Sequence, residues 1–149
     1  MNARDPQMPL DSGADDGAQA LLDNAERAWD EQIVPAMTDY IGVPAKSPMF
    51  DADWARHGYL DRVVRDAAAW VEQQKVPGLR LEVVRLEGRT PLIFFEIPAT
   101  RAGSTDTVLM YGHLDKQPEF NGWRSDLGPW TPKYEDGKLY GRGGADDGY

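Results

Sequence analysis

A short apolar run, Thr107–Tyr111, restricts the fold of this chain more than any other feature of its sequence. Four large apolar side chains follow one another there, and a strand that is apolar at successive positions must be covered on both faces. Two β-rich runs precede it, Leu79–Leu86 and Leu92–Ile97, with Gly88 in the connection between them, which predicts a hairpin. The three runs predict a sheet that needs helices to cover it.

Two helical patterns precede the predicted strands. The first spans Ala18–Ile41, where apolar residues recur every three or four positions and predict one core-facing stripe. Its members are Leu22, Ala25, Trp29, Ile33, Met37 and Tyr40. Pro35 lies inside the pattern and has no backbone donor, so we expect a kink or break near residues 31–34.

The second helix is expected to begin at an N-cap of Asp51 or Asp53 and to end near Gln74, before Pro77 and Gly78. Its inward positions would be Leu60, Val64, Ala67 and Val71. Helices followed by strands predict an α/β fold in which helices pack on a sheet.

Charge and composition restrict the possible partners. The chain has 149 residues and a net charge of −9, which argues against binding nucleic acid or an anionic membrane surface. Residues 1–17 are acidic and poor in large apolar groups, so we expect a disordered acidic tail. There is no secretory signal pattern and no apolar run long enough to span a bilayer, which indicates a cytoplasmic protein.

The chain has no cysteine and only two histidines, so any metal would be held by histidine and carboxylates. His113 and Asp115 directly follow the run 107–111, at the carboxyl end of the predicted strand, where ligands bind in open α/β sheets. Alternation along a strand would send both side chains to one side, so that the carboxylate can orient the imidazole. A purely structural histidine is the alternative. His57, among charged residues of the second helix, is expected to be a surface or capping residue.

A glycine-rich segment closes the chain, YGRGGADDGY at residues 140–149. Its glycines allow a sharp turn just before two adjacent carboxylates. The segment completes neither a dinucleotide fingerprint nor a phosphate-binding loop, and it lacks the alternating ligands of a calcium hand. By itself it could equally be a turn with solvated aspartates.

Taken together, the two segments resemble the di-zinc aminopeptidase-like family of metallopeptidases and amidohydrolases. The resemblance is carried by YGHLDKQP at 111–118, Gly122-Trp123, and DGKLYGRGGADD at 136–147. That family includes dipeptidases, aminoacylases, succinyl-diaminopimelate desuccinylases and glutamate carboxypeptidases. The Gln-Pro and Gly-Trp pairs are most similar to the dipeptidase branch. Lys116 stands where the family commonly has an apolar residue.

The resemblance implies a site and an activity. His113 would bind one metal ion, Asp115 would be the catalytic-site carboxylate that clamps that histidine, and Asp146 would bridge two divalent ions, zinc first, with manganese or cobalt as alternatives. The implied reaction is hydrolysis of a small peptide or an acyl-amino acid. A non-catalytic metal-binding or interaction domain of the same fold is the alternative.

In the family, the general-base glutamate and the remaining ligands come after the Asp-Asp pair. We therefore expect residues 18–149 to be the incomplete N-terminal part of the catalytic domain. This part would contain the beginning of a zinc-peptidase-like sheet with helices packed on it. The chain alone would be inactive, and a homodimer is possible for the full-length enzyme.

Overall fold

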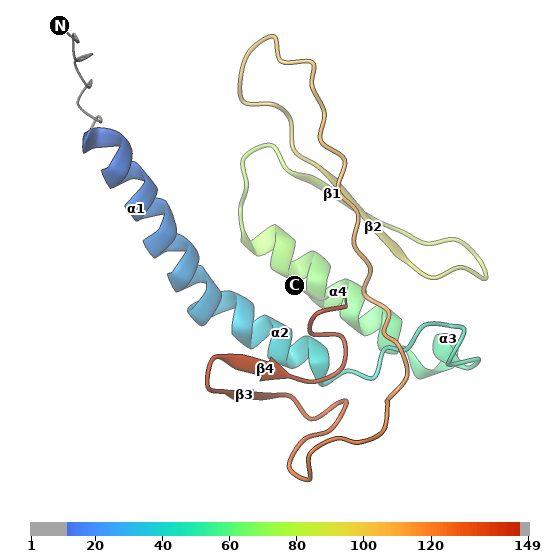
Figure 1. The fold of residues 1–149 in the computed structure, drawn as a ribbon. Helices are drawn as coiled ribbons and strands as arrows, with labels where there is room; N and C mark the ends of the chain where they lie inside the picture. Colours follow the sequence, from blue (N-terminus) through green and yellow to red (C-terminus); the bar gives the residue numbers. More distant parts are fainter. Residues whose placement is uncertain (1–11, 147–149) are drawn as a thin grey trace, which may run out of the picture. The chain divides into compact units, whose positions relative to one another are not determined.

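The computed structural model describes residues 12–146, shown in Figure 1. They form helices and two small antiparallel sheets, which confirms the predicted mixture of α and β structure. The chain divides after Ala36 into two compact units, which are described separately. Within residues 12–146, no helix is both long enough and apolar enough to cross a membrane.

The first unit is a helix with a local irregularity. Helix α1 (Ser12–Ala28) passes into a π-helical turn, η1 (Trp29–Ile33), and helix α2 (Val34–Ile41) follows and continues into the second unit. Pro35 cannot donate to the carbonyl four residues before it, and its ring crowds that carbonyl, so the helix widens just ahead of it. The irregularity predicted near residues 31–34 is confirmed.

Two sequence predictions about this region need correction. Helix α1 begins at Ser12, so the predicted tail is helical over residues 12–17, because elongation adds one hydrogen bond per residue to an existing helix. Residues 1–11 lie outside the described part. The apolar stripe is core only at its end: Met37 is buried, whereas Leu22 and Trp29 are 58% and 44% exposed. Within residues 12–36 there is one helix, and a helix cannot cover its own stripe.

The core of the second unit forms where the end of α2, the connector after it and helix α4 (Tyr59–Gln73) meet. The buried residues of this cluster are Val43, Ala45, Leu60 and Val63. The predicted second helix is interrupted at Gly58, so a short helix α3 (Trp54–His57) precedes α4. Asp53 occupies the N-cap position of α3, and Leu60 and Val64 are buried as predicted.

The predicted hairpin is confirmed. Strands β1 (Arg80–Val84) and β2 (Leu92–Glu96) pair antiparallel, with Val83 opposite Ile93. Helix α4 packs against both strands, and the Arg85 guanidinium donates to the Asp61 carboxylate across this contact.

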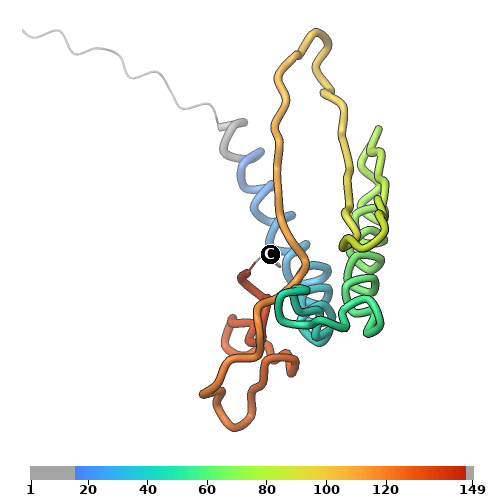
Figure 2. Tube along the Cα trace, turned by 90° about the vertical axis from the view of Figure 1, so that its right-hand side faces the viewer, coloured from blue at the N-terminus to red at the C-terminus, as the bar shows by residue number. Residues whose placement is uncertain are grey.

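The prediction of a covered strand at Thr107–Tyr111 is wrong. After β2 the chain turns near residues 100–103 and runs extended toward His113 without joining a ladder (Figures 1 and 2). Leu109 is 90% exposed, and its apolar neighbours are similarly open. A strand covered on both faces needs flanking strands and overlying helices, and within residues 12–146 no element supplies them. The apolar pattern indicates that these side chains would be stabilised by burial, but it does not show that other elements cover them.

A second hairpin was not predicted. Strands β3 (Lys133–Glu135) and β4 (Lys138–Tyr140) pair antiparallel through Asp136 and Gly137, whose φ angles are 51° and 72°. Positive φ at both central residues matches a type I′ turn, for which Asp-Gly is a favoured sequence. The Asp-Gly pair was the signal that could have revealed it.

Replacing Leu60 by alanine tests the core. Leu60 is 4% exposed and Leu86 is 66% exposed, so Leu60→Ala should cost about 2–5 kcal/mol of unfolding free energy and the matched Leu86→Ala within about 0.5 kcal/mol. Urea unfolding measures both. Equal costs would show that the cluster around Leu60 is not the stabilising core.

Candidate metal centre

The residue between His113 and Asp115 holds this segment in place. Leu114 packs against the core cluster, and its carbonyl accepts a hydrogen bond of 3.0 Å from the Tyr40 hydroxyl. With Leu114 directed inward, its two neighbours meet: His113 Nδ1 lies 3.2 Å from Asp115 Oδ1. The predicted contact between the imidazole and the carboxylate is confirmed, although the segment is not a strand.

The hydrogen bonds of His113 select its tautomer. Nδ1 also lies 2.9 Å from the backbone carbonyl oxygen of Asp115, and because a carbonyl can only accept, Nδ1 must carry the proton. In the neutral ring, Nε2 then holds the lone pair, the form that binds a metal ion. Nε2 lies 3.7 Å from Asp146 Oδ1. The structure thus brings the three predicted site residues together.

The distance between Nε2 and Oδ1 fits two ligands of one cation. Zinc binds imidazole nitrogen and carboxylate oxygen at about 2.0–2.2 Å, so neighbouring ligands of a tetrahedral ion lie about 3.4 Å apart. The observed 3.7 Å needs only a small adjustment. Within residues 12–146 there is no group of three or more histidines and acids able to hold a metal. Asp115 faces the other ring nitrogen, Nδ1.

His57 lies apart from this group, as predicted. Its Nδ1 is 2.8 Å from Asp51 Oδ2 at the end of α3. The hydrogen bond from His57 lowers the pKa of Asp51. His57 is exposed, so it is the surface residue that the sequence predicted.

Lys116 was overlooked as a structural residue. It is 1% exposed, and its Nζ donates to the carbonyls of Tyr40 and Val43 at 2.5 and 2.7 Å. Burial lowers the pKa of this ammonium to about 7. In the sequence Lys116 stood out only as a departure from the family resemblance, and its partners lie more than 70 residues away.

The glycines before Asp146 allow close packing within the protein. A Cβ atom on Gly141 would lie 2.1 Å from Ile41 Cγ2, and one on Gly143 would lie 2.9 Å from the Lys116 stem. Their φ angles are 146° and 88°. The sequence predicted a sharp turn at these glycines, and the structure adds that they let the Asp146 loop rest on Ile41 and Lys116.

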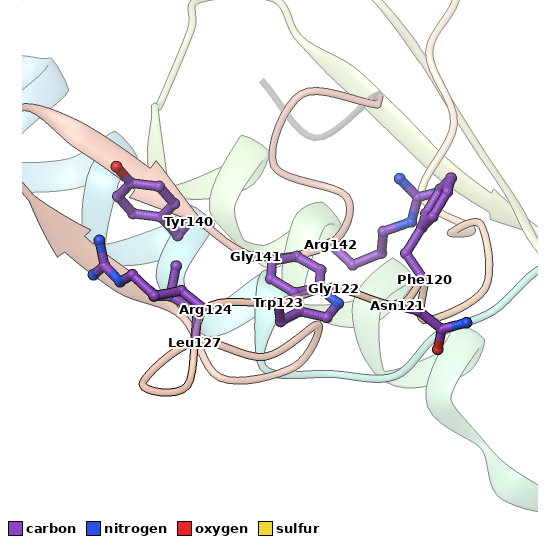
Figure 3. A pocket seen from close by; sticks show the side chains of 9 residues that line it. All are labelled: Phe120, Asn121, Gly122, Trp123, Arg124, Leu127, Tyr140, Gly141 and Arg142. Carbon is purple, nitrogen blue, oxygen red and sulfur yellow. The ribbon is translucent and has the colours of Figure 1, made fainter.

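An open hollow of about 420 Å³ lies between the loop after Pro118 and the end of β4 (Figure 3). Aromatic and cationic groups line it: Phe120, Trp123, Arg124, Tyr140 and Arg142 among others. Arg142 Nε donates to the Pro118 carbonyl at 3.0 Å, and its guanidinium lies 4.6 Å from the centre of the Phe120 ring. The arginine of the glycine-rich segment thus fastens the loop that follows the His113 segment.

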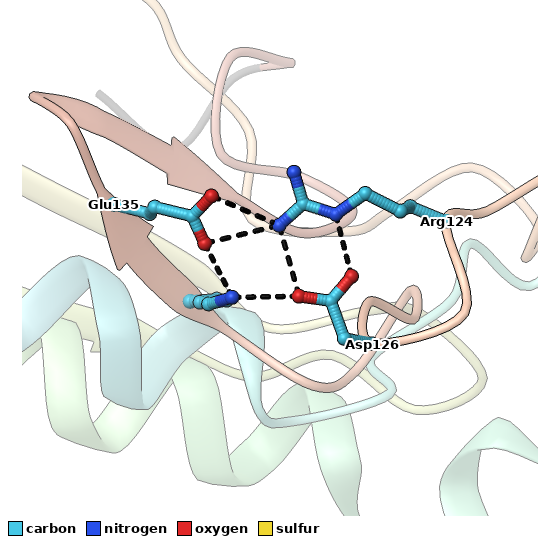
Figure 4. A network of polar contacts seen from close by, with 4 residues as sticks. Arg124, Asp126 and Glu135 are labelled. Carbon is cyan, nitrogen blue, oxygen red and sulfur yellow. Dashed lines mark hydrogen bonds and ion pairs between the residues drawn. The ribbon is translucent and has the colours of Figure 1, made fainter.

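Ion pairs hold the same loop to the second hairpin (Figure 4). Arg124 Nη2 contacts Asp126 at 2.9 Å and Glu135 at 3.0 Å, and Lys133 contacts both carboxylates. The hydrogen bond from Arg124 holds the pKa of Asp126 far below its usual range, and the one from Lys133 lowers the pKa of Glu135.

Comparison with known proteins finds local similarity in the part of the chain that carries His113 and Asp146. Residues 109–149 match the profile of Peptidase family M20/M25/M40. The chain is 54% identical over 43 residues to a Beta-Ala-His dipeptidase of Mus musculus and 51% identical over 43 residues to that of Rattus norvegicus. It is 49% identical over 49 residues to a succinyl-diaminopimelate desuccinylase of Ralstonia nicotianae.

These matches are local. They involve 28–31% of this chain and span 8–12% of the length of the relatives. Over the matched residues they confirm the family resemblance carried by the two motifs, and the two dipeptidases agree with the predicted branch.

A pair of glycine substitutions tests the packing of the Asp146 loop. Gly88 and Gly143 both have positive φ, but a Cβ would meet nothing within 4 Å at Gly88 and the Lys116 stem at Gly143. Gly88→Ala should cost about 1–2 kcal/mol from the backbone alone, and Gly143→Ala about 1–3 kcal/mol more from overpacking. Chemical denaturation measures both, and equal losses would contradict the close approach.

Acidification tests the ion-pair network. The pKa values of Asp126 and Glu135 are lowered in the folded chain, so their contribution is present above the ordinary carboxyl range and is lost as pH falls through the lowered values. Asp126→Asn should therefore flatten the decline of the urea midpoint between pH 6 and pH 2. Asp106→Asn, in an exposed loop, is the control and should follow the wild type; an unchanged slope in Asp126→Asn would contradict the assignment.

Proposed function

We propose that this chain, which carries a segment of Peptidase family M20/M25/M40 at residues 109–149, contributes to the metal centre of a hydrolase of peptide or related amide bonds. One observation carries the proposal: His113 Nε2 faces Asp146 Oδ1 at 3.7 Å while Asp115 holds the other ring nitrogen. This arrangement supplies a nitrogen ligand, an oxygen ligand and the group that orients the first of them.

Each residue has a distinct task in this proposal. His113 offers the Nε2 lone pair, Asp146 offers a carboxylate that can bridge two ions, and Asp115 fixes the ring of His113. The donor set of imidazole and carboxylate suits zinc, and also manganese or cobalt. Two such ions would polarise the scissile carbonyl and lower the pKa of the attacking water.

The proposed substrates are small peptides or acyl-amino acids. The names of the relatives support this class, because β-alanyl-histidine carries a peptide-type bond and succinyl-diaminopimelate carries an acyl-amino bond. Both substrates are amides with carboxylate groups close to the bond that is cut. A non-catalytic metal-binding domain is the alternative. It predicts the same result in the first test below, which measures metal binding, and a different result in the second, which measures hydrolysis.

The first test is metal binding by the purified chain, measured by calorimetry with zinc. His113→Ala removes a ligand and should weaken the affinity by at least about tenfold. Asp115→Asn should weaken the zinc affinity less than His113→Ala does, because the Asp115 carbonyl still accepts from Nδ1. Loss of such an orienting partner typically costs at most about 10–100-fold in metal affinity. His57→Ala is the matched control, since His57 at the end of α3 pairs with Asp51, and should bind like the wild type.

If His113→Ala and His57→Ala bind zinc alike, the proposed centre is wrong. The second test asks whether the enzyme that contains this segment hydrolyses β-alanyl-histidine or succinyl-diaminopimelate in a metal-dependent way. Loss of turnover in His113→Ala, with partial loss in Asp115→Asn, is expected. Metal binding without hydrolysis of any amide in a broad dipeptide and acyl-amino-acid panel would favour the non-catalytic alternative.

A further inference from the structure

Lys116 is an unusual feature of this site because it is a charged side chain in the interior. It is 1% exposed, although burying an ammonium is costly unless several acceptors compensate. The compensation comes from the end of α2 and the connector after it: Nζ reaches the carbonyl oxygens of Tyr40, Ile41 and Val43 at 2.5, 3.4 and 2.7 Å. It also lies 3.9 Å from the centre of the Tyr40 ring.

The buried ammonium needs these acceptors. Two of the carbonyls also accept from backbone N–H groups, Tyr40 from Val43 at 3.1 Å and Val43 from Ala45 at 2.8 Å. Tyr40 and Ile41 belong to the last turn of α2, where the helix carbonyls carry the negative end of the dipole and attract a cation. An ammonium has three donors and no acceptor, which matches three carbonyl oxygens. The Tyr40 ring adds an attraction between the cation and its π face.

The backbone of Lys116 is bound to the same part of the chain. Its N–H donates to the Ala45 carbonyl at 2.8 Å, and its carbonyl accepts from the Ser47 N–H at 2.9 Å. Lys116 therefore fixes the segment that carries His113 and Asp115 by both backbone and side chain. His113 stands only three residues earlier.

The methylene stem of Lys116 forms a second contact, with the other loop of the site. A Cβ on Gly143 would lie 2.9 Å from its Cγ, Cδ and Cε atoms, so the Gly143 backbone rests directly on the stem. Asp146 follows three residues later. One side chain thus touches the loops that carry both proposed ligands.

We propose that Lys116 is a positioning residue, which sets the distance between His113 and Asp146 by anchoring the His113 loop to the end of α2 and supporting the Gly143 loop on its stem. This inference rests on the proposed function, because the distance matters only if the two residues share a metal ion. The anchoring itself is independent of the metal and can be measured without it.

The first experiment measures the loops directly. The chain contains no cysteine, so Gln117→Cys and Ala145→Cys, both at exposed positions, would give a unique pair of spin labels. Lys116→Met keeps a side chain of similar length and removes the ammonium. We expect the distance distribution between the labels to broaden at least about twofold in Lys116→Met, whereas the matched Lys138→Met, on the exposed side of β4, should retain the wild-type width.

The second experiment uses cobalt as the probe. Cobalt affinity of the full chain should fall about 10–100-fold in Lys116→Met, the range expected when a group that positions a ligand is lost, and should not change in Lys138→Met. Unchanged distance distribution and unchanged cobalt affinity in a cooperatively unfolding Lys116→Met would overturn the proposal, and so would a broadened distribution with wild-type affinity.

The two proposals fail in different ways. If wild-type chain and His113→Ala bind cobalt alike, the proposed metal centre fails, while the spin-label distances still decide whether Lys116 anchors the loops. If Lys116→Met does not fold, nitrogen NMR of the wild-type lysine side chains decides: a Lys116 ammonium that exchanges slowly supports the anchor, and one that exchanges as fast as Lys138 refutes it.

Discussion

The ammonium of Lys116 is buried and needs hydrogen-bond acceptors, which it finds at backbone carbonyls at the end of α2 and just after it. Lys116 reaches these carbonyls from a position 73 to 76 residues further along the chain. Its segment is thereby drawn against the connector after α2, beside the buried residues Val43 and Ala45. Leaving this ammonium unpaired in the interior would be costly, and this cost holds the two distant segments together.

The candidate metal centre is built outward from this contact. Leu114 enters the core, which leaves His113 and Asp115 on the other side of the backbone. Gly141 and Gly143 lie so close to Ile41 and Lys116 that a side chain at either position would collide, and this close approach brings Asp146 to His113. The side chains of His113 and Asp146 are partly exposed, and their geometry depends on the apolar and cationic groups beneath them.

The exposed surfaces are as informative as the core. The apolar residues 108–111 are open to solvent in this chain, and Phe94 and Phe95 of β2 are also about half exposed. Side chains of this kind are stabilised by burial, and α4 packs on the two-stranded sheet without burying them. The ordering of the site therefore comes from the contacts around Lys116 rather than from a completed sheet.

Local patterns in the sequence determined much of this protein: the helices, the irregularity ahead of Pro35, the hairpin around Gly88, and the meeting of His113 with Asp115. Each depends on residues a few positions apart, whose geometry follows from backbone sterics and side-chain periodicity. The Asp136-Gly137 turn belonged to the same class and could have been predicted.

Only the tertiary structure decided which apolar groups are covered and how the site is supported. Leu22 and Leu109 have the pattern of buried residues and are exposed, because burial depends on what packs against a segment and not on the segment itself. The pattern likewise gave Lys116 no role, because its partners lie more than 70 residues away in sequence. Hydrogen bonding and close packing between distant segments, which no local pattern encodes, placed His113 and Asp146 side by side.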